Sequence, residues 1–368
     1  MSPERLISSR LDFRGRITVA ATAVSFFIII VSLMVVGGFR REIRSGIGSL
    51  MGDVQLTADV VESSDSLLSA ITAVKGVESV TPAVYRTAVV KTESGLQGVL
   101  VKGVPLEGES LTVSIPPSLS RKLGVGPGDA LTTYFIGDKV KVRKFTVSDI
   151  FRDMLLPDDR AIVQVPLADL QRVNGWDSTQ VSALEVRLSP KFNDAATQRA
   201  KAQELSAVGG MRAQAAVDRY SRLFEWLGLL DYNVAAILLL MTLVAGFNMV
   251  SGLLIMLFRN TGTIGTLKAL GMGNRGISKV FLRVASGVTL KGLAWGGGAA
   301  ALFAIIQGTT HLLRLNPENY FVSYVPIAVD PLKIMLVCAA AYAVIMILLL
   351  LPALFIARVD PAETVRVK

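Results

Sequence analysis

Four long runs of apolar residues stand out along the chain, at positions 17–38, 233–258, 284–307 and 333–357. A helix needs about 20 apolar residues to cross a hydrocarbon core of about 30 Å, and each run reaches that length. The pattern therefore predicts four membrane-spanning helices. A cleaved signal peptide is the alternative for the first run, but the run is long for one and helix-like sequence continues beyond it.

The stretch at 53–212 has a different pattern, in which short segments alternate apolar and polar residues between turn signals. Such alternation is typical of half-buried strands. The expected strands are 54–60, 77–90, 98–104, 130–135, 139–149, 161–165 and 181–188, and the expected helices are 66–74 and 193–206. We predict an α+β domain built mainly on antiparallel pairs.

Two of the membrane helices are predicted to extend beyond the membrane as stalks. Apolar residues recur about a turn apart from position 215 and lead, without a proline, into the second span. One helix over 213–258 would be on the order of 70 Å long at a rise of about 1.5 Å per residue. Continuation of the first helix through 39–50 would give a second stalk beside it.

Composition and charge indicate the class of protein and its orientation. The chain has 368 residues, 51% of them hydrophobic, a mean hydropathy of +0.52 and a net charge of +9. Its basic residues flank the apolar runs instead of gathering on one soluble module, so nucleic-acid binding is not expected. The loop at 259–283 holds Arg259, Lys268, Arg275, Lys279 and Arg283 and no acidic residue. Cytoplasmic loops carry this excess of positive charge, so both chain ends are predicted to be cytoplasmic.

This topology divides the chain into nine segments. They are a cytoplasmic tail (1–16), the first span with its stalk (17–52), an extracytoplasmic α+β domain (53–212), a stalk with the second span (213–258), a cytoplasmic basic segment (259–283), the third span (284–307), an external loop (308–332), the fourth span (333–357) and a cytoplasmic tail (358–368). The third span is rich in small residues, which let membrane helices pack closely. Its Lys291 is either a functional cation or a side chain that snorkels to the inner face.

The sequence holds no motif for catalysis or cofactor binding. It has one cysteine, Cys338, and one histidine, His311, so a zinc site built from these residue types is not expected. The phosphate-binding loop G-x-x-x-x-G-K-[ST], the nucleophile elbow G-x-S-x-G and the zinc motif H-E-x-x-H do not occur. We therefore expect no enzymatic activity and no cofactor in this chain.

Several blocks of the sequence resemble a known family. They are GFRREIRSGIGSLMGDVQL (38–56), VKGV (101–104), RKLGVGPGDAL (121–131), FNMVSGLLIM (247–256), TIGTLKALGMGNRGISKVF (263–281), YFVSYVPIAVDPLKIMLV (320–337) and LPALFIARVDPAETVRV (351–367). These blocks are similar to permease subunits of ABC transporters of the MacB/FtsX/LolCDE, or mechanotransmission, superfamily. Within it they resemble most the LolC/LolE lipoprotein-releasing transmembrane subunits.

The resemblance implies an integral membrane α-helical protein of the bacterial inner (cytoplasmic) membrane, with four transmembrane helices and a large α+β periplasmic domain on helical stalks. It implies a permease that works with a second copy of itself or a LolC/LolE-type paralogue, and with a separate LolD-like ATPase subunit that binds the ATP. LolC/LolE permeases extract lipoproteins from the inner membrane and pass them to a LolA-like periplasmic carrier. Membrane lipids would be further contacts of such a chain.

The resemblance also implies two sets of functional residues. Those expected to couple to the ATPase are Gly262, Thr263, Gly265, Leu267, Lys268, Leu270, Gly271 and Arg275. Those expected to line the substrate cavity are Phe26, Phe27, Val31, Met34, Phe39, Leu239, Leu243, Phe247 and Val250. Lipid-facing or helix-packing side chains are the alternative for each lining residue.

Two features depart from the family pattern. Thr263 stands where the family usually has a glutamate before the I-G-x-L-K-A-x-G run, so the coupling contact is expected to differ in detail. The stretch 134–144 is short where LolC carries a long hairpin that grips the carrier, which puts direct carrier recruitment in doubt. An FtsX-like subunit that activates a periplasmic cell-wall hydrolase and a MacB-like exporter are the alternative functions.

Overall fold

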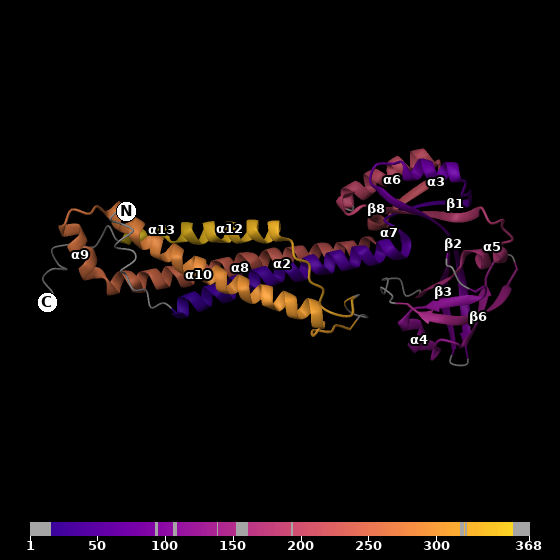
Figure 1. Cartoon of the computed structure of the whole chain (residues 1–368), viewed down its shortest axis with the longest axis horizontal. Coiled ribbons are helices and arrows are strands. Elements are labelled where there is room, and N and C mark those ends of the chain that lie inside the picture. The colour runs from indigo at the N-terminus through magenta and orange to yellow at the C-terminus, as the bar shows by residue number, and fades with distance from the viewer. Residues whose placement is uncertain are drawn as a thin grey trace. The chain divides into compact units, whose positions relative to one another are not determined.

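The computed structural model shown in Figure 1 describes residues 16–92, 95–105, 109–137, 139–151, 161–192, 194–316, 320 and 322–355. Apart from Arg16, the expected cytoplasmic tails at 1–16 and 358–368 lie outside these residues, as does the end of the fourth span. The chain divides into two compact units, and each is described by itself. The first unit comprises residues 1–40, 228–314 and 324–368, and the second comprises residues 41–227 and 315–323.

Among the described residues, four helices are long and apolar enough to cross a membrane. They are α2 (Arg16–Met51), α8 (Ser221–Arg259), α10 (Asn274–Thr310) and α12 (Pro331–Leu348), the last followed by α13 (Leu350–Phe355). All four contribute to one buried apolar cluster of the first unit, which includes Phe26, Met249, Phe281 and Ile345. The prediction of four membrane helices is confirmed.

The helices α2 and α8 are longer than a membrane is thick. With 36 and 39 residues they extend for about 54 and 58 Å at 1.5 Å per residue, against a hydrocarbon core of about 30 Å. Residues 41–51 of α2 and 221–227 of α8 belong to the second unit. An ion pair between Arg40 and Asp231 joins the two helices within the first unit. Both helices thus have the length that a membrane span with a stalk requires.

The second unit is built on a mixed sheet. Its strands are β1 (Val54–Glu62), β2 (Val77–Thr92), β3 (Gly95–Val104), β4 (Thr112–Ile115), β5 (Ala130–Phe135), β6 (Lys141–Ile150), β7 (Ala161–Pro166), β8 (Gln180–Leu188) and β9 (Arg212–Ala215). Six of these strands form a closed barrel. Each strand pairs with the next in the order β2, β3, β7, β4, β6, β5, and β5 pairs with β2 again. The first half of β2 leaves this barrel and pairs with β8, and the sheet continues through β1 to β9.

Short helices complete this α+β unit. They are α3 (Asp65–Thr72), α4 (Pro117–Leu123), α5 (Leu167–Asn174), α6 (Ala195–Gly209), α7 (Ala216–Arg219) and the 3-10 helix η1 (Pro190–Phe192). Alternate residues of β5, namely Leu131, Thr133 and Phe135, are buried, as expected when one strand face forms the core. The ring of Phe135 packs edge-to-face on that of Phe145, with centroids 6.4 Å apart. The predicted α+β class is confirmed.

The structure differs from the sequence pattern in several elements. The strands β4 and β9 and the helix α5 were not predicted, and α8 begins at Ser221 although the apolar pattern extends the helix back to 213. The reason is that Arg212–Ala215 forms a backbone ladder with β1, with Ala215 opposite Val54, and this pairing overrides the local helical pattern. The third membrane helix also starts earlier than its apolar run, at Asn274. Gly273, in an extended conformation, is the residue directly before the first turn of α10.

Candidate functional site: a membrane cavity and a basic helix at the end of the membrane helices

The basic segment between the second and third spans contains a short helix, α9 (Thr261–Ala269), placed between the end of α8 and the start of α10 (Figure 1). The carbonyl oxygen of Asn260 accepts a hydrogen bond from the N–H of Ile264 at 2.9 Å, which starts the helix. Gly271 has a φ of +86°, and its N–H donates to the carbonyl oxygen of Lys268 at 2.9 Å. Glycine adopts this left-handed conformation without a Cβ clash, so the helical turn ends there.

Most residues predicted to contact an ATPase lie on the exposed side of α9 and the turn after it. Gly262, Thr263, Leu270, Gly271 and Arg275 are exposed, Leu267 and Lys268 are half-buried, and Gly265 is buried. The other side of α9 carries Ile264, which belongs to the apolar cluster of the membrane helices. One side of α9 therefore packs on the membrane helices, and the other side is exposed. Leu270, which follows α9 directly, is 79% exposed.

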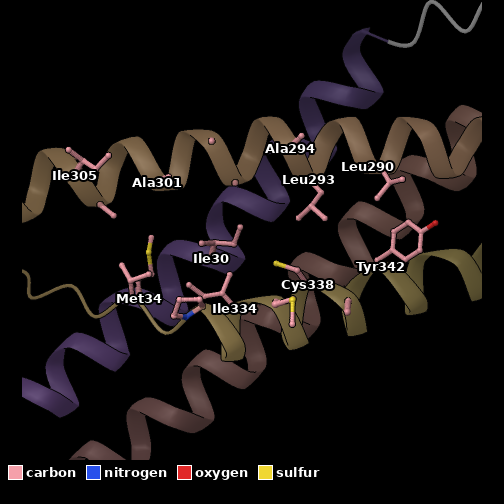
Figure 2. Close-up of a pocket in the computed structure, with 17 residues that line it drawn as sticks. Ile30, Met34, Leu290, Leu293, Ala294, Ala301, Ile305, Ile334, Cys338 and Tyr342 are labelled. Atoms are coloured by element: carbon pink, nitrogen blue, oxygen red, sulfur yellow. The ribbon is translucent and has the colours of Figure 1, made fainter.

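A cavity of about 840 Å³ lies between α2, α10 and α12 (Figure 2). Figure 2 shows side chains converging on it from all three helices, among them Ile30, Met34, Leu290, Leu293, Ile334 and Cys338. Tyr342 closes one end, and its hydroxyl lies 2.7 Å from the hydroxyl of Ser286. Binding cavities for small molecules have volumes of about 300–1,000 Å³, so this one is large enough for a ligand.

Small residues on α10 make room for this cavity. Ala294, Gly297, Gly298 and Ala301 line it, and a Cβ at Gly298 would meet no other atom within 4 Å. The wall is almost wholly apolar and would leave a polar solute without hydrogen-bond partners, so it suits hydrocarbon. The run of small residues at 296–301 is the sequence signal that could have indicated a cavity, although it predicts close helix packing equally well.

The predicted lining residues of α2 lie at different places. Met34 lines the cavity. Phe26 is completely buried in the helix packing, and the ring of Phe27 packs edge-to-face on Phe303 of α10 with centroids 6.3 Å apart. Val31 is half-buried and Phe39 is buried. Of the α2 residues predicted to line a cavity, only Met34 is therefore among those that line this one.

The predicted lining residues of α8 form an outward-facing apolar strip. The side chains of Leu239, Leu243 and Phe247 are 64, 37 and 63% exposed, and Val250 is half-buried. Residues four apart lie on one face of a helix, so the three exposed side chains share a surface. The single chain does not bring this strip to the cavity that Met34 lines.

A stripe of small residues brings α2 and α10 close together. Gly292, Gly296 and Ala300 are buried at intervals of four on α10. A Cβ at Gly296 would lie 2.4 Å from the carbonyl oxygen of Ala23 on α2 and 3.0 Å from the Cβ of Phe26. Small residues at this spacing allow the backbones of membrane helices to approach each other closely. This contact holds α2 in place as one wall of the cavity.

Gly296→Ala is expected to lower the thermal unfolding midpoint of the purified protein. Overpacking costs about 1–3 kcal/mol, and each kcal/mol shifts the midpoint by about 2–4 °C in a chain of this kind. Gly287→Ala is the matched control on the same helix, because a Cβ there meets no atom within 4 Å. Its higher helix propensity should leave the midpoint equal or raise it. Equal midpoints for the two variants in the same detergent would contradict the close contact between α2 and α10.

Comparison with known proteins defines the class to which this structure belongs. A family model for the MacB-like periplasmic core domain matches residues 17–203, and a model for the FtsX-like permease C-terminal matches residues 235–361. The first match covers α2 and most of the α+β unit, and the second covers α9 and the last three membrane helices. The fold is thus that of a multi-pass membrane permease with a periplasmic-type domain. The chain belongs to the family of ABC transporter permeases that includes MacB, FtsX, LolC and LolE.

Curated relatives match almost the entire chain. The lipoprotein-releasing system transmembrane protein LolC of Neisseria meningitidis serogroup B is 25% identical over 405 residues, covering 97% of this chain and 94% of that protein. The corresponding LolE of Haemophilus influenzae is 23% identical over 385 residues, with 93% and 91% covered. LolC of Xylella fastidiosa is 22% identical, with 97% and 94% covered. The resemblance to LolC/LolE permeases is confirmed.

Solved structures of related domains are also similar to part of the chain. The periplasmic region of MacB from Actinobacillus actinomycetemcomitans has a TM-score of 0.30 and 12% identity, and covers 49% of this chain and 95% of that chain. The extracellular domain of the noncanonic ABC-type transporter YknZ from Gram-positive bacteria has a TM-score of 0.28 and 13% identity, with 44% and 97% covered.

Proposed function

We propose that this chain is the permease subunit of an inner-membrane ABC transporter that extracts lipoproteins and passes them to a periplasmic carrier. The observation that carries the proposal is the end-to-end match with a LolC whose name assigns it to a lipoprotein-releasing system. The match covers 97% of this chain, so it includes the membrane helices, the stalks and the α+β domain.

A separate ATPase subunit is the energy source in this proposal. Removing an acyl chain from a bilayer costs about 0.8 kcal/mol per methylene, so a chain of about 15 methylenes costs roughly 12 kcal/mol. The sequence has no phosphate-binding loop with which to obtain that energy itself. The exposed residues of α9 and of the chain that follows it, among them Leu270 and Arg275 at the start of α10, support docking of the ATPase there. The basic residues of the 259–283 segment would attract an acidic surface on that partner and orient the encounter.

A second permease subunit completes the substrate path in this proposal. The apolar strip of Leu239, Leu243 and Phe247 is exposed on α8 in the single chain. We assign it to a space shared with a second copy or a LolC/LolE-type paralogue, in which the acyl chains of the substrate are held. The cavity between α2, α10 and α12 has the apolar wall that suits a lipid chain of the surrounding bilayer.

The experiment that tests the proposal is purification of the tagged full-length protein from its own host in mild detergent, with mass spectrometry of everything bound. An ATPase subunit together with acylated lipoproteins is the expected result. The number of permease species in the complex then tells a homodimer from a heterodimer. Purified complex in proteoliposomes should release a lipoprotein into the soluble fraction when ATP and a carrier are added.

Other outcomes would overturn the extraction function. An ATPase with a peptidoglycan hydrolase and without lipoproteins would favour an FtsX-like signalling subunit, to which the FtsX-like match also points. An adaptor protein together with an outer-membrane duct would favour a MacB-like exporter. Absence of any ATPase would remove the basis that all three functions share.

A further inference from the structure

The end of α2 is tied to β8 through the backbone of the second unit. Gly52 ends the helix with a φ of +71°, and its N–H donates to the carbonyl oxygen of Gly48 at 3.0 Å. The N–H of Asp53 then donates to the carbonyl oxygen of Val186 at 2.9 Å, and the Asp53 carboxylate accepts from the N–H of Leu188 at 2.8 Å. The end of α2 is therefore hydrogen-bonded directly to β8.

The second stalk starts from the same place. Strand β9, which precedes α7 and α8, pairs with β1, and the N–H of Ala216 donates to the carbonyl oxygen of Asp53 at 2.8 Å. The hydroxyl of Tyr220 contacts the sulfur of Met51. The end of α2 and the approach to α8 thus meet on the sheet β8–β1–β9. We call this meeting point, residues 50–53 and 215–220, the stalk joint.

A buried lysine connects the barrel to the stalk joint. Lys102 lies on β3, and its ammonium group donates to the carbonyl oxygen of Leu50 in the last turn of α2. The same nitrogen lies 2.8 Å from a carboxylate oxygen of Glu185 on β8, and both side chains are at most 6% exposed. Tyr85, directly opposite Lys102 on β2, donates its hydroxyl to the other oxygen of Glu185. One ammonium group thereby contacts the end of α2 and the partner strand β8.

These side chains lie where β2 changes partners. β2 pairs with β8 as far as Ala83, opposite Ala183, and with β3 from Val84, opposite Gly103. Each half of the unit is therefore held by a different stretch of β2, which is the strand that both halves share. The pair Lys102–Glu185 is a side-chain link between the halves, because Lys102 belongs to the barrel and Glu185 to the other half.

The chemistry of this contact indicates a role beyond stability. Apolar residues of similar volume often stabilise a fold as well as a buried ion pair does, so an ion pair is not required for packing. A cation at the C-terminal end of a helix is favoured by the helix dipole and points its donors at the last carbonyl groups. Burial, followed by the neighbouring Glu185 carboxylate, raises the pKa of Tyr85 well above its ordinary value, so this phenol keeps the proton it donates. Lys102, Glu185, Tyr85 and the carbonyl group of Leu50 thus form one network of charged and hydrogen-bonded groups, whose geometry is fixed by its donors and acceptors.

We propose that Lys102 is a positioning residue that transmits movement of the α2 stalk to the β-barrel of the periplasmic-type domain. The inference rests on the proposed function, in which ATP hydrolysis by the partner subunit moves the stalks. With Lys102 in place, the barrel and β8 follow the end of α2 together. Without it, the barrel loses its side-chain link to the end of α2 and to Glu185, and the shared strand β2 is left to connect it to β8. Substrate release per ATP hydrolysed therefore depends on Lys102, whereas binding of the ATPase does not.

The test uses the full-length permease with its ATPase in proteoliposomes and compares three forms. The variant Lys102→Met/Glu185→Gln removes both charges, so that no unpaired charge stays buried. Tyr85→Phe is the matched control, because it removes a partner of Glu185 but leaves both contacts of Lys102. The double variant is expected to hydrolyse ATP at a rate close to that of the wild type and to release about tenfold less lipoprotein per ATP, a typical coupling effect. Tyr85→Phe should release lipoprotein as the wild type does.

A parallel fall of ATP hydrolysis and release, with their ratio unchanged, would overturn the inference and make Lys102 a packing residue. If the double variant does not fold, Lys102→Gln/Glu185→Gln repeats the comparison, since it also removes both charges and leaves two amide side chains that can hydrogen-bond to each other. Hydrogen exchange gives a readout that needs no substrate: ATP should change exchange in the barrel strands of the wild type and not in the variant. The same change in both would contradict the role of Lys102. A wild-type complex that releases no lipoprotein would overturn the proposed function instead.

Discussion

Replacing Gly38 with alanine is expected to lower the thermal unfolding midpoint of the protein by roughly 6–12 °C, since overpacking against backbone atoms costs about 3 kcal/mol and each kcal/mol shifts the midpoint by about 2–4 °C. A Cβ at this position of α2 would lie 2.2 Å from the carbonyl oxygen of Pro326, 2.4 Å from its carbonyl carbon and 2.8 Å from the nitrogen of Ile327. All three atoms are backbone, so no rotation of a side chain can relieve the clash. The segment before α12 would have to move away from α2.

The neighbouring glycine supplies the control. A Cβ at Gly37 would lie 3.7 Å from the Cβ of Ala328, an ordinary van der Waals distance. Gly37→Ala therefore makes the same chemical change in the same helix without the clash. Thermal unfolding of both variants, followed by circular dichroism in one detergent, separates packing from helix propensity. Equal midpoints would contradict the placement of 326–328 against α2.

This contact also bears on the membrane cavity. The N–H of Ala328 donates to the carbonyl oxygen of Met34 at 3.0 Å, and Met34 itself lines the cavity. Val329 and Pro331, which follow directly, line the cavity as well. Close approach at Gly38 thus holds the start of α12 where it closes one end of the cavity. We expect Gly38→Ala to alter the cavity as well as to destabilise the membrane unit.

Leu270→Asp is expected to weaken binding of the ATPase subunit by about 10- to 100-fold. Full burial of a leucine side chain contributes about 1.5–3 kcal/mol, and each 1.4 kcal/mol changes an equilibrium constant about tenfold. In the single chain Leu270 is 79% exposed at the end of α9, so the substitution removes partner contacts and leaves the fold intact. The measurement is co-purification of the permease with a tagged ATPase subunit, followed by titration of the purified components.

Two control variants test whether the loss of ATPase binding is specific to the apolar side chain at position 270. Leu270→Met keeps an apolar side chain and should bind the ATPase as the wild type does. Leu96→Asp makes the same chemical change at another exposed leucine, 66% exposed on β3 of the α+β unit, and should not affect binding. Equal affinities for Leu270→Asp and Leu96→Asp would show that α9 is not the docking element. Unchanged unfolding midpoints for all three variants exclude misfolding as the cause.

The positions of α9, the stalks and Lys102 suggest how one movement serves the proposed extraction. Helix α9 is joined to α8 at one end and to α10 at the other, so displacement of α9 by the ATPase acts on both. α8 begins just after the stalk joint, where Asp53 binds the N–H of Ala216. Lys102 then carries the displacement to the barrel. Variants at Gly38, Leu270 and Lys102 thus test separate steps of the proposed series of movements.

The sequence by itself determined those features that repeat locally along the chain. Apolar runs of about 20 residues are diagnostic of membrane helices, since the cost of burying charge in lipid excludes most other residues from them. Alternation with period two identified the larger strands of the α+β unit. The family resemblance was likewise readable from contiguous blocks, such as 263–281.

Only the tertiary structure decided which distant segments meet. Residues 212–215 form a strand because β1 offers them a backbone ladder, and local pattern cannot indicate a partner about 160 residues away. Lys102 reads as an ordinary polar strand residue, yet it is buried because Glu185 and the end of α2 supply its partners. Gly37 and Gly38 are the same residue type at neighbouring positions of one helix. They differ because the backbone of Pro326 approaches Gly38 and not Gly37. Contacts between distant segments depend on how helices cross and strands pair, and neither is encoded in the periodicity of one segment.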